Sequence, residues 1–180
     1  RKFLRQIGAT TLASAATPFA SFAAKAKAEE RILRYDRTFS NNDTVRIGVI
    51  GYGVQGHFDL RTALQVPGVE LAGICDIYKS RLTRAQEEFG KDLFVTRSYK
   101  ELLAKDDIDA VLICTTDVWH SQITLDALAK GKHIYLEKPM MHKIEEGYPM
   151  MKAAEKSGKV FQVGSQRVSS VGYAKAKELL

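Results

Sequence analysis

A glycine-rich spacing followed by an acid is the clearest chemical signal in the chain. Gly51-x-Gly53-x-x-Gly56 follows the apolar run VRIGVI, and Asp76 lies 20 residues past Gly56. The first glycine permits a tight turn, the second lets the backbone approach a pyrophosphate, and the third lets a helix pack close to a strand. Asp76 is placed to accept hydrogen bonds from ribose hydroxyls. The pattern predicts a dinucleotide site; the alternative is a glycine-rich turn with Asp76 as an ordinary strand-end residue.

The type of dinucleotide depends on the acid. A carboxylate at position 76 repels a 2′-phosphate and therefore favours NAD, whereas Lys79 and Arg81 leave room for NADP. The expected cofactor contacts in this region are Gly51, Tyr52, Gly53, Val54, Gln55, Gly56 and Asp76.

An alternating series of strands and helices is needed to bring such residues together. Apolar runs of strand length are expected at Val45–Ile50, Val69–Cys75, Leu93–Val95, Ala110–Cys114, His133–Leu136 and Val160–Val163. Helical patterns are expected at 56–66, 79–89, 121–130, 144–157 and 173–180. Ser98 and Glu101 have the spacing of a capping box at one further helix start. The alternation predicts an α/β fold of Rossmann type, a doubly wound parallel sheet with helices on both faces.

The segments just after each strand are where chemistry is expected, because ligands of open parallel sheets bind outside the carboxyl ends of the strands. Three such segments carry polar side chains: Thr115–His120, Glu137–Pro139 and Gly164–Arg167. We expect all three on the same edge as the glycine turn.

Four stretches in this order, GYGVQG, CTTDVWH, AKGKHIYLEKP and QVGSQR, resemble the Gfo/Idh/MocA oxidoreductases, the glucose–fructose oxidoreductase and inositol dehydrogenase superfamily. The resemblance runs from about Val45 to Leu180, and the EKP segment is its most specific part. Thr116 departs from it, since the family usually has proline there. The resemblance implies a Rossmann domain over 45–165, followed from 166 by the start of an α+β substrate domain that continues beyond Leu180.

The resemblance also implies roles for individual residues. Lys138 matches a lysine that helps to position or polarise the reacting hydroxyl or carbonyl; the alternative is a solvated lysine in a loop. Thr115, His120 and Glu137 are expected near the cofactor, although Glu137 also suits support of the loop and His120 suits a polar helix start. Trp119, Gln166 and Arg167 are expected near the substrate, with a surface salt bridge as the alternative for the arginine.

Composition and charge bear on nucleic-acid binding and on where the protein is located. The net charge is +6, but the first 28 residues hold five basic and no acidic side chains, so the rest is nearly neutral and nucleic-acid binding is not expected. Residues 1–28 predict a cleaved signal peptide, with Arg1–Arg5 similar to the end of a twin-arginine motif. Export to the periplasm or beyond is therefore expected, after a linker over 29–44. The leader is too polar and broken for a stable membrane span.

The expected activity is hydride transfer between NAD and a secondary hydroxyl or carbonyl of a sugar, inositol or related polyol, in a full-length homo-oligomer. Two alternatives remain: a glycoside hydrolase similar to N-acetylgalactosaminidases, which uses transient oxidation at sugar C3, and a non-catalytic nucleotide-binding module. The resemblance places the remaining catalytic Asp and His beyond Leu180. Cys75 and Cys114 are expected to be buried thiols, and no metal is expected because no ligand cluster has suitable spacing.

Overall fold

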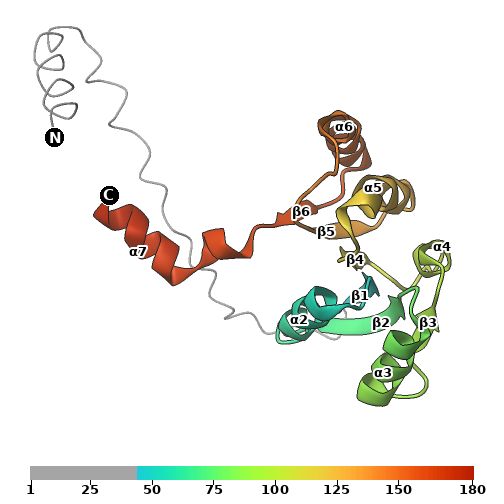
Figure 1. The fold of residues 1–180 in the computed structure, drawn as a ribbon. Coiled ribbons are helices and arrows are strands. Elements are labelled where there is room, and N and C mark those ends of the chain that lie inside the picture. Colours follow the sequence, from blue (N-terminus) through green and yellow to red (C-terminus); the bar gives the residue numbers. More distant parts are fainter. Residues whose placement is uncertain (1–43) are drawn as a thin grey trace, which may run out of the picture. The chain divides into compact units, whose positions relative to one another are not determined.

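The structure is a computed structural model that describes residues 44–180, so the predicted leader lies outside the described residues. Strands and helices alternate along this part of the chain (Figure 1). The strands are β1 (Val45–Ile50), β2 (Val69–Cys75), β3 (Phe94–Thr96), β4 (Ala110–Ile113), β5 (His133–Glu137) and β6 (Phe161–Gly164). The α-helices are α2 (Val54–Ala63), α3 (Lys79–Phe89), α4 (Tyr99–Leu103), α5 (His120–Ala129), α6 (Gly147–Ser157) and α7 (Val171–Leu179). Short 3₁₀ turns are η2 (Asp117–Trp119), η3 (Ile144–Glu146) and η4 (Gln166–Ser169).

The six strands form one sheet in the order β3-β2-β1-β4-β5-β6. Every neighbouring pair is parallel. The chain moves outward from β1 to β3 and then returns to the other side of β1, so the strand order reverses between β1 and β4. Such a reversal opens a crevice at the carboxyl ends of the strands. The predicted doubly wound α/β fold is confirmed.

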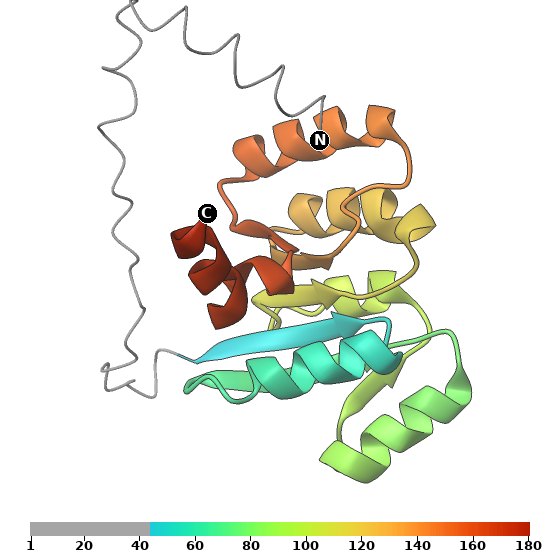
Figure 2. The same cartoon turned by 60° about the vertical axis from the view of Figure 1, so that its left-hand side comes forward.

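Helices cover both faces of the sheet (Figure 2). On one face, α2 and α3 pack on the sheet through Leu60 and Leu82. On the other face, α4, α5 and α6 bury Leu102, Ile123 and Met150. Because successive strand residues point to opposite faces, strands buried on both sides read as nearly continuous apolar runs, which is why they were recognisable in the sequence.

Two local expectations need correction. Helix α2 begins at Val54 rather than Gly56, because Gly53 already occupies the N-cap position. Ser98 is the N-cap of α4, but it makes no side-chain capping bond. The Glu101 carboxylate instead accepts from the Thr96 hydroxyl, and the Thr96 hydroxyl oxygen accepts from the Ser98 N–H. The predicted capping box is therefore wrong: a threonine at the end of β3 takes the serine's place.

Lys132 has a structural role that its position in the GKH stretch did not reveal. Its side chain is buried, and Nζ donates to the carbonyl oxygens of Lys105 and Ile108, at 2.7 Å each. These bonds join the start of β5 to the segment between α4 and β4. The buried ammonium is thus paired with two backbone acceptors.

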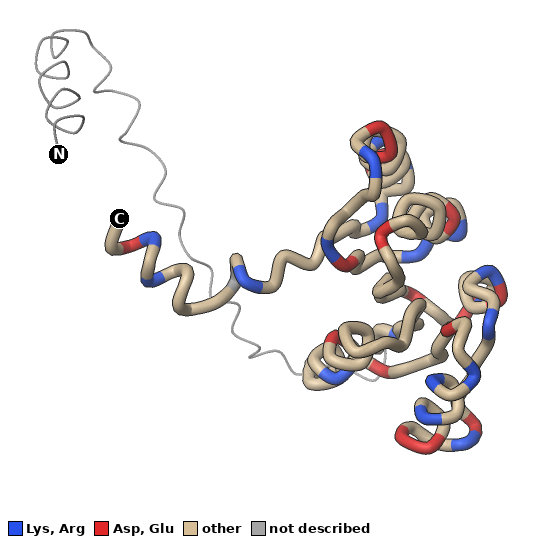
Figure 3. Tube along the Cα trace, in the orientation of Figure 1, with Lys and Arg blue, Asp and Glu red and all other residues tan. Residues whose placement is uncertain are grey.

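Basic and acidic residues are both spread over the helices and loops of residues 44–180 (Figure 3). None of the helices in this part of the chain is long and apolar enough to cross a membrane.

Candidate functional site

A cleft of about 570 Å³ lies at the carboxyl ends of the strands. Its walls come from the ends of β1 and β2, the segments that follow β1, β2, β3 and β4, and the helices α2, α3, α4 and α5. The residues that line it are Ile50, Gly51, Gly53, Val54, Gln55, Cys75, Asp76, Ile77, Tyr78, Arg81, Arg97, Tyr99, Cys114, Thr115, Thr116, Trp119 and Ile123. Segments distant in the sequence, from the glycine turn to the residues after β4, therefore share one hollow.

The glycine turn is packed too closely for side chains at two of its positions. Gly51 has φ +94°, and a Cβ there would lie 2.7 Å from the carbonyl oxygen of Cys114. A Cβ on Gly56 would lie 2.0 Å from the carbonyl oxygen of Gly51, so α2 can approach the turn only without one. Gly53 differs, because a Cβ would meet only the Arg81 guanidinium, at 3.5 Å. Gly53 instead leaves open space in the wall of the cleft.

The N-terminus of α2 is suited to an anion. Its N-cap, Gly53, offers no side-chain cap, and the first turn contains no acidic residue. The first N–H groups of a helix have no partner within the helix, and the helix dipole adds a partial positive charge there. Val54 and Gln55, in this turn, line the cleft. These features fit a pyrophosphate.

Asp76 is held rigidly at the end of β2. The side chain is buried, and Oδ2 accepts from the Tyr52 N–H at 2.8 Å while Oδ1 accepts from the Tyr78 N–H at 2.9 Å. Arg81 adds an ion pair, with Nη1 3.1 Å from Oδ2. Tyr52 is fixed at its other end as well, since its buried ring carries a hydroxyl that donates to Glu88 at 2.9 Å. Asp76 thus forms part of one network with the glycine turn.

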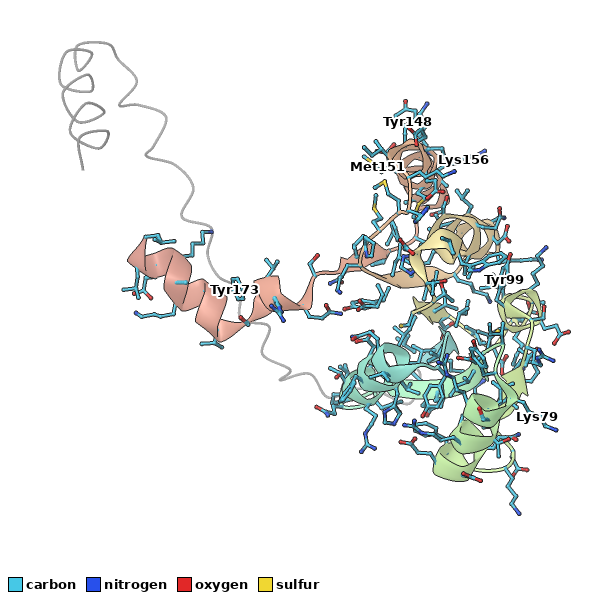
Figure 4. The ribbon with its side chains drawn as sticks, viewed as in Figure 1. Lys79, Tyr99, Tyr148, Met151, Lys156 and Tyr173 are labelled. Atoms are coloured by element: carbon cyan, nitrogen blue, oxygen red, sulfur yellow. The ribbon has the colours of Figure 1, made fainter. Side chains whose placement is uncertain are left out.

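Sequence reasoning missed several residues at this end of the cleft. Arg97 follows β3 directly, and its Nε donates to the Ile77 carbonyl at 3.1 Å. Tyr99, labelled in Figure 4, is the first residue of α4, and its hydroxyl donates to Asp126 of α5 at 2.8 Å. Burial and that bond raise the pKa of Tyr99 to about 12. Ligands of open parallel sheets bind outside the carboxyl ends of the strands. Applied to β3, this rule would have identified Arg97 from the sequence.

Of the residues predicted to be functional in the segment after β4, some line the cleft and one does not. Thr115, Thr116 and Trp119 line the cleft, and Trp119 is exposed. His120 is buried behind them, with Nε2 3.0 Å from the Thr115 carbonyl oxygen and Nδ1 2.7 Å from that of Pro139. Its role as a cofactor contact stays a prediction, and both of its ring nitrogens already face protein carbonyls.

Lys138 follows β5, beyond the residues that line the cleft, and its side chain is exposed. Within residues 44–180 its ammonium makes no hydrogen bond or ion pair. The Lys138 N–H donates to Glu137 Oε2 at 3.2 Å, and the Lys138–Pro139 peptide bond is cis. Gln166, in η4, donates to Glu137 Oε1, whereas Arg167 is exposed. The structure therefore joins Glu137 and Gln166 but does not bring Arg167 to either.

Two carboxyl groups, the buried Glu137 and the half-buried Asp59, interact near the end of β5. Asp59 of α2 acts on Glu137 electrostatically, and it accepts from Gln55 at 2.8 Å and from the Cys114 thiol at 3.5 Å. Burial, with the Asp59 charge as a second cause, raises the pKa of Glu137. Burial beside Asp59 also raises the pKa of Cys114, so this residue is a thiol and not a nucleophilic thiolate. No group of three or more metal-ligating side chains occurs in the part of the chain described here.

The fold, the glycine turn and the strand-end acid define a dinucleotide-binding α/β domain, and comparison with known proteins identifies its family. Residues 45–165 match the Gfo/Idh/MocA model, described as an oxidoreductase family with an NAD-binding Rossmann fold. The chain belongs to this family.

Individual relatives carry two kinds of name. The chain is 35% identical over 129 residues to an alpha-N-acetylgalactosaminidase from Shewanella oneidensis. This alignment covers 65% of the chain and 27% of that protein. It is similar to the structures of scyllo-inositol dehydrogenase from Lactobacillus casei (28% identity, TM-score 0.70) and myo-inositol 2-dehydrogenase from Lactobacillus plantarum (26% identity, TM-score 0.71). Both alignments cover 76% of this chain and 40% of the other. The chain thus spans about a quarter of the curated relatives that it matches.

The raised pKa of Glu137 gives stability a specific pH dependence. The folded state binds this proton more tightly than the unfolded state, so the stabilisation is complete below the unfolded pKa and is lost as pH rises through the folded pKa. Melting temperatures measured upward from about pH 4.5 should therefore fall less steeply for Glu137→Gln than for wild type. Glu155→Gln, at an exposed helix position, is the control and should follow wild type. Parallel profiles for wild type and Glu137→Gln would contradict the assignment.

Proposed function

We propose that the protein containing this chain is an NAD-dependent oxidoreductase that acts on a secondary hydroxyl or carbonyl of a sugar, inositol or related polyol. Two observations carry the proposal. The cleft contains the uncapped start of α2, which suits an anion, and Lys138 follows β5 at the same edge of the sheet and has no side-chain partner within residues 44–180. Membership of the family and the likeness to two inositol dehydrogenases support the same chemistry.

Several residues would hold the dinucleotide. The Gly51–Gly56 turn and the uncapped start of α2 suit its pyrophosphate, and Thr115 lines the same cleft. Asp76 suits the adenosine ribose. When bound, the nicotinamide supplies the group that accepts or donates the hydride.

Lys138 is suited to stabilise negative charge on the reacting oxygen of the substrate. Negative charge develops on this oxygen as its proton leaves or before a proton arrives, and a nearby ammonium stabilises that charge. The flanking main chain is fixed by Glu137, so the ammonium is presented from a held backbone. Gln166 and Trp119 stay proposed substrate neighbours, as does Arg167.

A direct assay separates this proposal from its rival. Full-length protein incubated with NAD and a panel of inositols and sugars should accumulate NADH steadily. Lys138→Met should lower kcat by about 100-fold, the size expected for losing one charge-stabilising group in the transition state, with little change in NAD affinity. Lys143→Met, in the same loop, is the matched control and should keep wild-type turnover. Full turnover in Lys138→Met would contradict the role of the lysine.

The rival is an NAD-dependent glycoside hydrolase, favoured by the 35% identity to an N-acetylgalactosaminidase. In that case aryl N-acetylgalactosaminides should release their aryl group while NAD stays bound and no NADH accumulates. A protein with neither activity would instead be a nucleotide-binding module. The three outcomes are mutually distinguishable in one set of reactions.

We also propose that NAD is preferred to NADP. A 2′-phosphate would have to lie beside the buried carboxylate of Asp76, and like charges brought together weaken binding. Arg81 offsets part of this effect, because its guanidinium lies 3.1 Å from Asp76 and is partly exposed. Lys79, labelled in Figure 4, begins the same helix. Calorimetric titration of one preparation with both cofactors should give the lower dissociation constant for NAD, and a lower constant for NADP would overturn this preference.

A further inference from the structure

His120 joins two loops at the functional edge of the sheet. Its ring is 1% exposed, and its nitrogens lie 2.7 Å and 3.0 Å from the carbonyl oxygens of Pro139 and Thr115. Thr115 belongs to the segment after β4, which lines the cleft, and Pro139 belongs to the segment after β5. One imidazole therefore spans the gap between the neighbouring loops.

The chemistry of this contact is specific to histidine. Carbonyl oxygens only accept hydrogen bonds, so each contact needs an N–H on the ring. A ring with one N–H donates to one carbonyl, and a doubly protonated ring donates to both. A glutamine amide carries both of its donors on a single nitrogen, so it cannot bridge two carbonyls that lie on opposite sides of the ring.

The bridge ends beside Lys138. On one side of this residue, its own N–H is held by the Glu137 carboxylate at 3.2 Å. On the other side, the carbonyl of Pro139 is held by His120 at 2.7 Å. The main chain is thus fixed before and after Lys138, while the ammonium has no partner within residues 44–180.

We propose that His120 is a positioning residue for Lys138, which it holds in register with the cofactor-lining segment at Thr115. This role rests on the proposed function, because it assigns no chemistry to the imidazole itself. The ring is too deeply buried for the substrate to reach, and it acts only through the backbone of the two loops.

A second link between the same segments provides the matched control. His142 Nδ1 lies 3.0 Å from Asp117 Oδ2, and both side chains are substantially exposed. The hydrogen bond from His142 lowers the pKa of Asp117. Exposed pairs of this kind contribute little to stability. Removing His142 should therefore disturb the loop far less than removing His120.

The test compares His120→Gln with His142→Gln in the full-length protein, with hydrogen exchange and steady-state kinetics as readouts. In His120→Gln, amides in peptides covering 114–119 and 136–143 should exchange at least about tenfold faster, while those of β1 and β2 exchange as in wild type. Its kcat should fall by about 10- to 100-fold, the effect of misplacing a catalytic group by a fraction of an ångström to 1 Å, with NAD affinity within about threefold. His142→Gln should stay within about threefold of wild type in every readout.

Three results would overturn the proposal. Unchanged exchange in the two loops would remove the tether, and faster exchange spread evenly over the domain would assign His120 to general packing alone. A loss of NAD affinity that equals the loss of kcat would assign it to cofactor binding. An inactive wild-type protein would refute the proposed function instead, and the exchange pattern would still decide whether His120 holds the loops.

Discussion

Helix α2 lies so close to the turn that follows β1 that one methyl group between them would collide with the main chain. A Cβ on Gly56 would stand 2.0 Å from the carbonyl oxygen of Gly51, and one on Gly51 would stand 2.7 Å from that of Cys114. This contact aims the uncapped start of α2 into the cleft and brings β4 alongside it. Asp76 depends on it too, because it accepts the N–H of Tyr52 within the turn. The shape of the proposed dinucleotide site thus depends mainly on backbone packing.

The parallel sheet distributes the functions along one edge. The proposed phosphate site is the turn after β1, the proposed ribose site is the end of β2, and the proposed catalytic lysine follows β5. In the sheet, β4 lies between β1 and β5, so contacts across β4 must fix the position of Lys138 relative to the glycine turn. Glu137 interacts electrostatically with Asp59 of α2, and His120 contacts the carbonyl oxygens of two loops.

Patterns that repeat along the chain predicted most of the fold, because strands buried on both faces are apolar throughout and helix ends carry glycines. Gly51, Gly53, Gly56 and Asp76 were recognisable since their spacing follows from covalent geometry and hydrogen-bonding reach. The contacts of Asp59, His120 and His142 were not, because each joins loops whose mutual distance depends on the packed sheet. The capping box failed for a related reason: a threonine from the preceding strand competes with Ser98 for Glu101, and local spacing does not contain that competitor.

Gly53 allows the central claim to be tested without disturbing the fold, because a Cβ there would meet only the flexible end of Arg81 at 3.5 Å. The decisive measurement is calorimetric titration of NAD into full-length wild type and Gly53→Ala, with melting temperatures recorded for both. If the turn holds the pyrophosphate against bare backbone, the variant should bind NAD at least about tenfold more weakly, a loss of about 1.4 kcal/mol, while its melting temperature stays close to that of wild type. Equal NAD affinity in the two proteins would contradict the account.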